Sequence, residues 1–171
     1  MEKFINRKEI YNGKIIHVVC DDVQIDDGSF SKREVAYHNG GVCIGLKHND
    51  KYFMVKQYRY ATGKEMLEFP AGKIEKGENP DDAILREAHE ETGYTAKNVV
   101  RLGSMIPTCG YSSEIIYLYS GIADEHLGQA LDVDERINVY EYSLQEIRQM
   151  IIEGKIDDGK TIALMYHLEN R

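Results

Sequence analysis

The sequence is short of cysteine and of long apolar runs, and each shortage excludes a class of protein. The cysteines are three, Cys20, Cys43 and Cys109, without the spacing of a metal site. They predict free thiols in a reducing cytosol rather than a disulfide framework. No run approaches the roughly 18 apolar residues that span a bilayer, and residues 1–8 lack the apolar core of a secretory signal. We therefore expect a cytoplasmic protein that does not associate with membranes.

Positive charge is also scarce. The chain has 21 Lys and Arg residues against 29 Asp and Glu residues, for a net charge of −8. This balance argues against general binding of nucleic acid through its phosphates. An enzyme acting on anionic substrates would then need bound cations or a few local arginines to reverse its own field. The 171 residues, 42% of them apolar, suffice for one domain with a buried core and a modest extension.

Alternating and β-branched residues predict strands over much of the chain. Residues 15–25 are of this kind, and a turn at 26–29 joins them to 30–37, which predicts an N-terminal antiparallel hairpin or meander. The mixture of strands with helices predicts an α+β or α/β sandwich around a mixed sheet. Further strands are predicted at 42–47, 52–58, 99–105, 115–120 and 137–142, and further helices at 143–153 and 160–168.

The strongest helix signals cover residues 80–92. Asn79 is a good N-cap and Pro80 fits the first helical position, where no amide donor is needed. Gly93 suits the position just after the helix. Within this helix Glu87, Glu90 and Glu91 stand at i, i+3 and i+4, so their carboxylates share one face.

Three acids on one helical face have two interpretations. Like charges at this spacing repel and weaken the helix, whereas converging carboxylates form the oxygen-rich environment that Mg²⁺ or Mn²⁺ prefers when shared with phosphates. The alternative is a charged, solvated helix face. The surrounding residues favour the metal, because they stand at the fixed spacings of a known motif. These residues are Gly72, Glu78, Arg86, Glu87, Glu90, Glu91 and Gly93.

This pattern resembles the Nudix box, and a match over so many fixed positions is a specific signal. The resemblance implies the Nudix fold, which is an α/β/α sandwich of the α+β class with a mixed central sheet. It also implies that Arg86 orients the acids by charge-assisted hydrogen bonds and that Glu78 braces the loop before the helix. The chemistry implied is hydrolysis assisted by Mg²⁺, with Mn²⁺ as a substitute, and the number of ions is left open. The metal ligands implied are the carbonyl of Ala71 and the carboxylates of Glu87, Glu90 and Glu91.

Beyond the box, the chain resembles the ADP-ribose pyrophosphatase branch of the Nudix hydrolases. The likeness rests on residues 33–42 and on Gln57-Tyr58-Arg59 with residues 67–72. It implies that Arg59 and Arg33 contact the substrate, because guanidinium binds phosphate bidentately or stacks on a base. Whether Arg33 does so in the site of a partner subunit is left open. The alternative for each arginine is a plain surface residue. Glu68 is predicted to lie beside the substrate, as a further acid of the metal site or of its water network. The alternative is an exposed glutamate on a strand.

The same branch implies a division of the chain and a dimer. Its members use a strand-rich N-terminal segment to associate, so residues 1–40 are expected to form a dimerisation segment and residues 41–171 the catalytic domain. The chain is therefore expected to be a homodimer whose ligand is a small nucleoside diphosphate derivative. One departure concerns the loop that tunes substrate choice, where Cys109 replaces the proline usual in the branch. Cys109 is interpreted as a small loop residue, since no helix dipole or histidine partner is evident.

ADP-ribose, hydrolysed to AMP and ribose 5-phosphate, is the leading substrate that the resemblance implies. The altered loop leaves open another nucleoside diphosphate derivative, such as GDP-mannose or FAD. A third alternative is a module that binds ADP-ribose without cleaving it, but such proteins tend to lose the acids of the box, and this chain keeps them.

One further acid is expected outside the box. In this family a loop glutamate often acts as general base or orients the attacking water, and residues 131–139 resemble that loop running into its strand. Glu135 fits best and Asp134 is the alternative, because a carboxylate within hydrogen-bond reach can accept a proton from metal-bound water. The opposing interpretation is that Asp132, Asp134 and Glu135 form a solvated acidic loop. Together with Arg86 and Glu91, Glu135 completes the set of expected catalytic residues.

Overall fold

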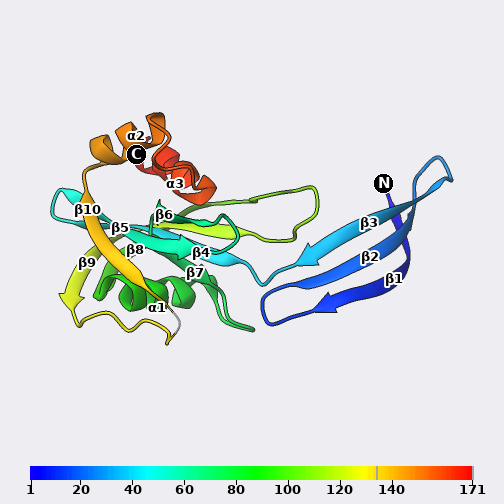
Figure 1. The fold of residues 1–171 in the computed structure, drawn as a ribbon, viewed down its shortest axis with the longest axis horizontal. Helices are drawn as coiled ribbons and strands as arrows, with labels where there is room; N and C mark the ends of the chain where they lie inside the picture. Colours follow the sequence, from blue (N-terminus) through cyan, green and yellow to red (C-terminus); the bar gives the residue numbers. More distant parts are fainter. Residues whose placement is uncertain (134, 171) are drawn as a thin grey trace. The chain divides into compact units, whose positions relative to one another are not determined.

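The computed structural model describes residues 1–133 and 135–170, which fall into two compact units. One unit comprises Met1–Gly40 and Ile106–Ile115, and the other comprises Gly41–Met105 and Ile116–Arg171. Figure 1 shows the elements of each unit. Within the described residues, no helix has the length and apolar character needed to cross a membrane.

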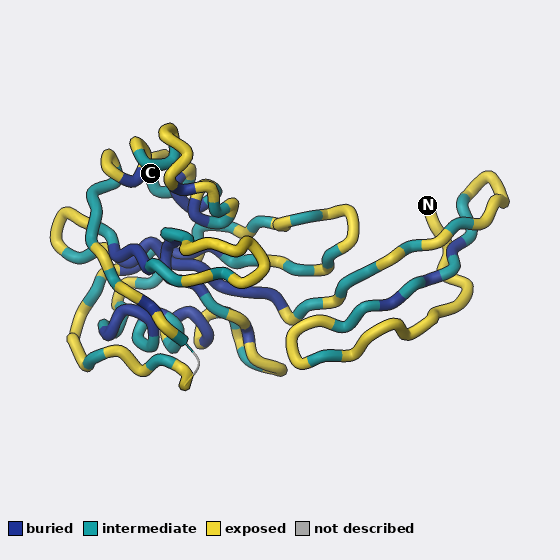
Figure 2. Tube along the Cα trace, in the orientation of Figure 1, coloured by how far each residue is buried: buried dark blue, intermediate teal, exposed yellow. Residues whose placement is uncertain are grey.

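The first unit contains an antiparallel sheet of three strands, β1 (Lys3–Asn12), β2 (His17–Gln24) and β3 (Phe30–Tyr37), in that order. Every residue of β1 is exposed, whereas β2 alternates and buries Val19 and Val23 (Figure 2). The predicted antiparallel N-terminal extension is therefore confirmed.

Residues 106–115 complete the first unit by binding to β3. The amide of Ala36 donates to the carbonyl of Tyr111 at 2.7 Å, and the amide of Ser113 donates to the carbonyl of Ala36 at 3.0 Å. The side chain of Ser113 also accepts a hydrogen bond from the amide of His38. The loop that carries Cys109 is thus held by the N-terminal sheet.

The second unit is built on a mixed sheet of seven strands. Five strands follow the order β10-β5-β4-β9-β8, while β6 pairs with β5 and β7 pairs with β4. The pair β4 and β9 is parallel, and the other pairs are antiparallel. The strands are β4 (Gly41–His48), β5 (Lys51–Arg59), β6 (Lys64–Glu68), β7 (Ala71–Lys73), β8 (Tyr94–Met105), β9 (Ile116–His126) and β10 (Ile137–Tyr142).

Strand β4 separates two hydrophobic cores because its side chains alternate between the two faces of the sheet. Ile44 packs in one core with Ile84 of α1 (Pro80–Thr92). Cys43 packs in the other core with residues of α2 (Leu144–Ile152) and α3 (Gly159–Glu169). Figure 1 shows α1 on one side of the sheet and α2 and α3 on the other. The predicted α+β sandwich with a mixed central sheet is confirmed.

The three predicted helices are present, and their ends follow their capping residues. Asn79 caps α1 by accepting from the amide of Asp81, and Gly93 ends the helix with a φ of 80°. Ser143 and Glu146 form a reciprocal capping box at the start of α2. Helix α1 packs against both β4 and β7, and its acidic face meets β7, where the amide of Ala71 donates to Glu91.

Candidate active site

Glu91 is the most deeply buried of the three predicted metal-binding acids on α1. It is 2% exposed and accepts a hydrogen bond of 2.8 Å from the amide of Ala71 on β7. Burial, reinforced by the nearby charge of Glu87, raises the pKa of Glu91 to about 8, although the Ala71 amide opposes the shift. The alternative of a solvated acidic face is therefore wrong for Glu91, because an acid this deeply buried needs a proton or a cation.

Arg86 links three carboxylates at the exposed end of the same cluster. Its Nε and Nη2 donate to the two oxygens of Glu78 at 2.9 and 3.0 Å. Its Nη1 donates to Glu87 at 2.8 Å and to Glu90 at 2.9 Å. This arginine lowers the pKa of Glu78. For Glu87, burial outweighs Arg86 and raises the pKa. One guanidinium thus fixes the directions of several acids while neutralising only one charge.

Glu135 lies in a loop that is fastened to the end of α1. The amide of Ala130 donates to the carbonyl of Glu90 at 3.1 Å, and the side chain of Gln129 donates to the carbonyl of Glu91 at 2.6 Å. The half-buried Glu135 is close enough that its charge raises the pKa of both Glu87 and Glu91. The charge of Glu135 therefore acts on two of the acids that are expected to bind the metal. The alternative acid, Asp134, lies outside the described residues.

The donor set of this cluster suits a hard divalent cation. Among residues 1–133 and 135–170, no group of three or more His, Cys, Asp or Glu side chains is already arranged as a metal cage. The chemistry of the donors fits nevertheless, because Glu87 and Glu91 both have raised pKa values and Glu135 adds to each shift. Partly buried carboxylates that raise one another's pKa are stabilised by a cation between them.

A second charged cluster adjoins Glu91 and contains two of the predicted substrate residues. Arg59 of β5 makes a bidentate pair with Glu68 of β6, at 2.7 and 2.6 Å. Glu68 is 1% exposed, so the alternative of an exposed strand glutamate is wrong. Lys160, in the first turn of α3, makes a second ion pair with Glu68. Sequence reasoning missed Lys160, because nothing near it in the chain indicates a partner 92 residues away.

The remaining predicted residue, Arg33, belongs to the first unit. It lies on β3, where it pairs with Glu2 and donates to the hydroxyl of Ser31 at 2.9 Å. Its side chain is 40% exposed, and its predicted contact with substrate remains a prediction.

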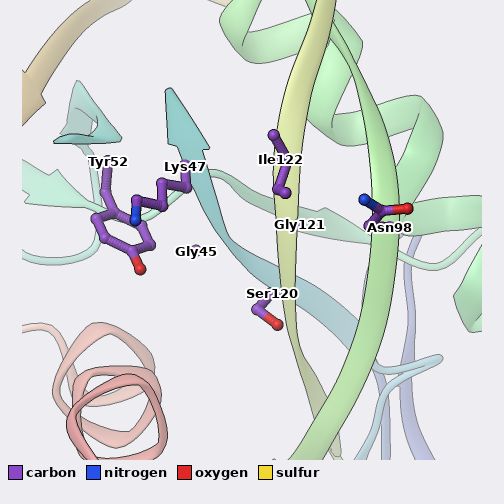
Figure 3. A pocket seen from close by; sticks show the side chains of 7 residues that line it. All are labelled: Gly45, Lys47, Tyr52, Asn98, Ser120, Gly121 and Ile122. Atoms are coloured by element: carbon purple, nitrogen blue, oxygen red, sulfur yellow. The ribbon is translucent and has the colours of Figure 1, made fainter. Parts of the chain in front are cut away.

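The second unit also has a pocket of about 240 Å³ that none of the predicted site residues lines (Figure 3). It lies over β4, β5, β8 and β9, and the side chains of Lys47 and Tyr52 form part of its wall. The cluster of carboxylates on α1 is therefore separate from this pocket.

The chain belongs to the Nudix family, because the model of the NUDIX domain matches residues 37–165. That range includes the whole box and the Arg59–Glu68–Lys160 cluster. The predicted membership is confirmed, and the chain is a Nudix hydrolase.

Curated relatives resemble the chain over nearly its full length. It is 39% identical to the methanol dehydrogenase activator of Bacillus methanolicus and 35% identical to the ADP-ribose pyrophosphatase of Bacillus subtilis. Each match covers 98% of this chain and 92% of the relative. A GDP-mannose pyrophosphatase of Klebsiella pneumoniae is 32% identical over 84% of this chain and 78% of its own length.

The fold matches a solved structure described as an ADP compounds hydrolase. The TM-score is 0.88, the alignment covers 99% of this chain and 92% of the other, and the sequences are 17% identical. The predicted Nudix fold is therefore confirmed.

Proposed function

We propose that this Nudix hydrolase cleaves the pyrophosphate bond of ADP-ribose in a Mg²⁺-dependent reaction, giving AMP and ribose 5-phosphate. The observation that carries the proposal is Glu91, buried to 2% exposure beside Glu87 and bonded to the Ala71 amide. Such an acid needs a cation to be ionised near neutral pH. The 35% identity to an ADP-ribose pyrophosphatase supports the choice of substrate.

The residues divide the proposed work between binding and proton transfer. The metal would be held by the carbonyl of Ala71 and the carboxylates of Glu87, Glu90 and Glu91. Arg86 orients two of these carboxylates by donating hydrogen bonds to Glu87 and Glu90. A bound divalent cation supplies charge neutralisation of the diphosphate and a water of lowered pKa. Glu135 would accept a proton from the attacking water, and Arg59 would bind a phosphate oxygen.

Two measurements test the proposal. Phosphate release, in a coupled assay across ADP-ribose, GDP-mannose and FAD, should be fastest with ADP-ribose, should stop in EDTA and should return with Mg²⁺ or Mn²⁺. The variant Glu91→Gln should lose at least about a hundredfold in kcat, whereas Glu153→Gln, at the exposed end of α2, should not. Full turnover in EDTA would refute the metal, and faster cleavage of GDP-mannose or FAD would refute the substrate.

A second candidate function comes from the relative of higher identity. The methanol dehydrogenase activator is 39% identical to this chain, so we also propose that this chain activates a dehydrogenase through its hydrolase activity. Adding the wild-type protein to a methanol dehydrogenase should then raise the turnover of the dehydrogenase, and Glu91→Gln should abolish the effect. An unchanged dehydrogenase rate would exclude this role and leave the hydrolase proposal intact.

The N-terminal sheet supports a proposed homodimer. All ten residues of β1 are exposed, and the sheet presents the large apolar side chains of Phe4, Ile10, Tyr11 and Phe30 to the surface. An exposed edge strand with apolar side chains favours pairing with a second copy. Light scattering at micromolar concentration should give twice the mass of the chain, and a monomer mass would refute the dimer.

We also propose that the protein is located in a reducing cytoplasm. Its three free cysteines, of which Cys109 is exposed, support this location.

A further inference from the structure

Glu68 has two cationic partners that differ in how firmly they are held. Arg59 is bidentate to Glu68 but its side chain is 38% exposed. Lys160 is 12% exposed and binds Asp158 at 3.1 Å as well as Glu68. Burial would raise the pKa of Glu68, yet the two cations together hold it below its usual value. Glu68 is therefore an ionised carboxylate in the interior with one accessible cation and one enclosed cation.

Lys160 is fixed in place by the start of α3. Asp158 caps the helix by accepting from the amide and the hydroxyl of Thr161, at 3.0 and 2.7 Å. The same hydroxyl accepts from the amide of Phe69, the residue after Glu68, at 3.0 Å. Because Thr161 is fully buried, this chain of bonds joins the first turn of α3 to the end of β6. Lys160 thus has little freedom to leave Glu68.

A buried carboxylate that loses its only counter-ion is strongly destabilised. With two cations, Glu68 can release one and stay paired with the other. Arg59 is the one that can be released, because it is the more exposed and because its planar fork binds phosphate as well as carboxylate.

We propose that Lys160 is a positioning residue, the permanent counter-ion of Glu68 that allows Arg59 to exchange Glu68 for a phosphate of the substrate. This inference rests on the proposed function, since it requires a ligand with a diphosphate group. Lys160 acts through Glu68 and Arg59 and does not itself touch the substrate. Without Lys160, Arg59 would be the counter-ion that Glu68 retains. A substrate that bound Arg59 would then leave the Glu68 carboxylate buried without a cation.

The test is a suppressor experiment with two readouts. The first readout is the KM and kcat for ADP-ribose with Mg²⁺, and the second is the Kd of ADP measured by calorimetry with Ca²⁺. Lys160→Met should raise KM and Kd at least about tenfold while kcat stays within about threefold. Adding Glu68→Gln should restore both constants to within about threefold of wild type, because nothing then retains Arg59. Lys160→Arg should resemble wild type, and Lys155→Met, a surface lysine of the loop after α2, is the matched control.

Several outcomes would overturn the inference. If Lys160 bound phosphate directly or served only to anchor α3, Glu68→Gln would not restore binding in the Lys160→Met background. If Lys160→Met fails to fold, Glu68→Gln alone decides, because it should leave the Kd of ADP at or below the wild-type value, and a tenfold rise would refute the exchange. Failure to hydrolyse ADP-ribose with ADP binding intact refutes the proposed substrate alone. Failure of the wild type to bind ADP refutes the inference as well.

Discussion

A Cβ atom at Gly72 would lie 1.8 Å from Cδ of Glu87 and about as close to both of its carboxylate oxygens. Glycine is thus required at residue 72 because the side chain of Glu87 on α1 leaves no room for a Cβ atom. The backbone conformation of residue 72 is not the reason. Strand β7 and helix α1 approach so closely here that the carboxylate occupies the space of a methyl group.

We therefore expect Gly72→Ala to displace the Glu87 carboxylate. A misplacement of about 1 Å costs on the order of a hundredfold in rate, so kcat with Mg²⁺ should fall by about that factor while the fold is retained. Gly159→Ala is the control, because its new methyl group would meet only Met105 Cε at 3.9 Å. Circular dichroism verifies folding, and a Gly72→Ala enzyme within threefold of wild type would show that Glu87 is not needed where it stands.

Replacing Thr161 with valine should destabilise the protein. The change keeps the shape of the side chain but leaves the buried Phe69 amide without its acceptor. The expected loss is about 1–3 kcal/mol in the free energy of unfolding, measured by urea denaturation. Thr62→Val removes an exposed hydroxyl bond to the Arg59 carbonyl and should change stability by less than about 0.5 kcal/mol. Equal effects of the two substitutions would contradict the role of the Thr161 hydroxyl.

The stability of the metal-free protein should fall as pH rises toward 8. Glu91 has a pKa of about 8 in the fold, against 4.5 for an unperturbed glutamate. Folding therefore favours the protonated form of Glu91. This contribution to the free energy of unfolding is complete below pH 4.5, decreases as the pH rises and is lost once the pH passes 8. Urea denaturation in EDTA between pH 5 and pH 8.5 measures the slope. In Glu91→Gln the slope should be shallower, and an identical pH dependence in both proteins would show that Glu91 titrates normally.

Glu135→Gln should separate catalysis from metal binding. If Glu135 accepts a proton from the attacking water, kcat should fall by about 10²–10⁴-fold. The affinity for Mn²⁺, measured by calorimetry, should change little. Asp132→Asn, an exposed acid of the same loop, is the control. If Asp134→Asn loses kcat while Glu135→Gln keeps it, the proton acceptor is Asp134 and not Glu135.

Sequence patterns predicted the elements whose signals are local. Helix α1 was predicted at its observed bounds, because Asn79, Pro80 and Gly93 mark its ends within the chain itself. Strand β1 was not predicted as a separate element, since its polar residues are exposed on both faces and lack an alternating pattern. The short strands β6 and β7 were missed for a related reason, because their pairing depends on β5 and β4.

Local geometry alone predicts only the part of the candidate site whose residues share one helix. The spacing of Glu87 and Glu91 follows from helical geometry, so their common face could be predicted. The burial of Glu68 could not, because it depends on α3 packing against the end of β6. Lys160 gave no signal at all, since its partner lies 92 residues away in the chain.

The fastening of residues 127–130 to the last turn of α1 limits how this enzyme can be re-engineered. The carbonyls of Glu90, Glu91 and Gly93 accept hydrogen bonds from this segment, so the acids and the connecting loop share one backbone scaffold. Inserting residues before Gln129 would displace the proposed metal-binding acids together with the loop. Insertions between Ala130 and Glu135 would alter only the reach of Glu135. Loop-length libraries aimed at changing activity while keeping the acids of α1 in place should therefore vary the chain after Ala130.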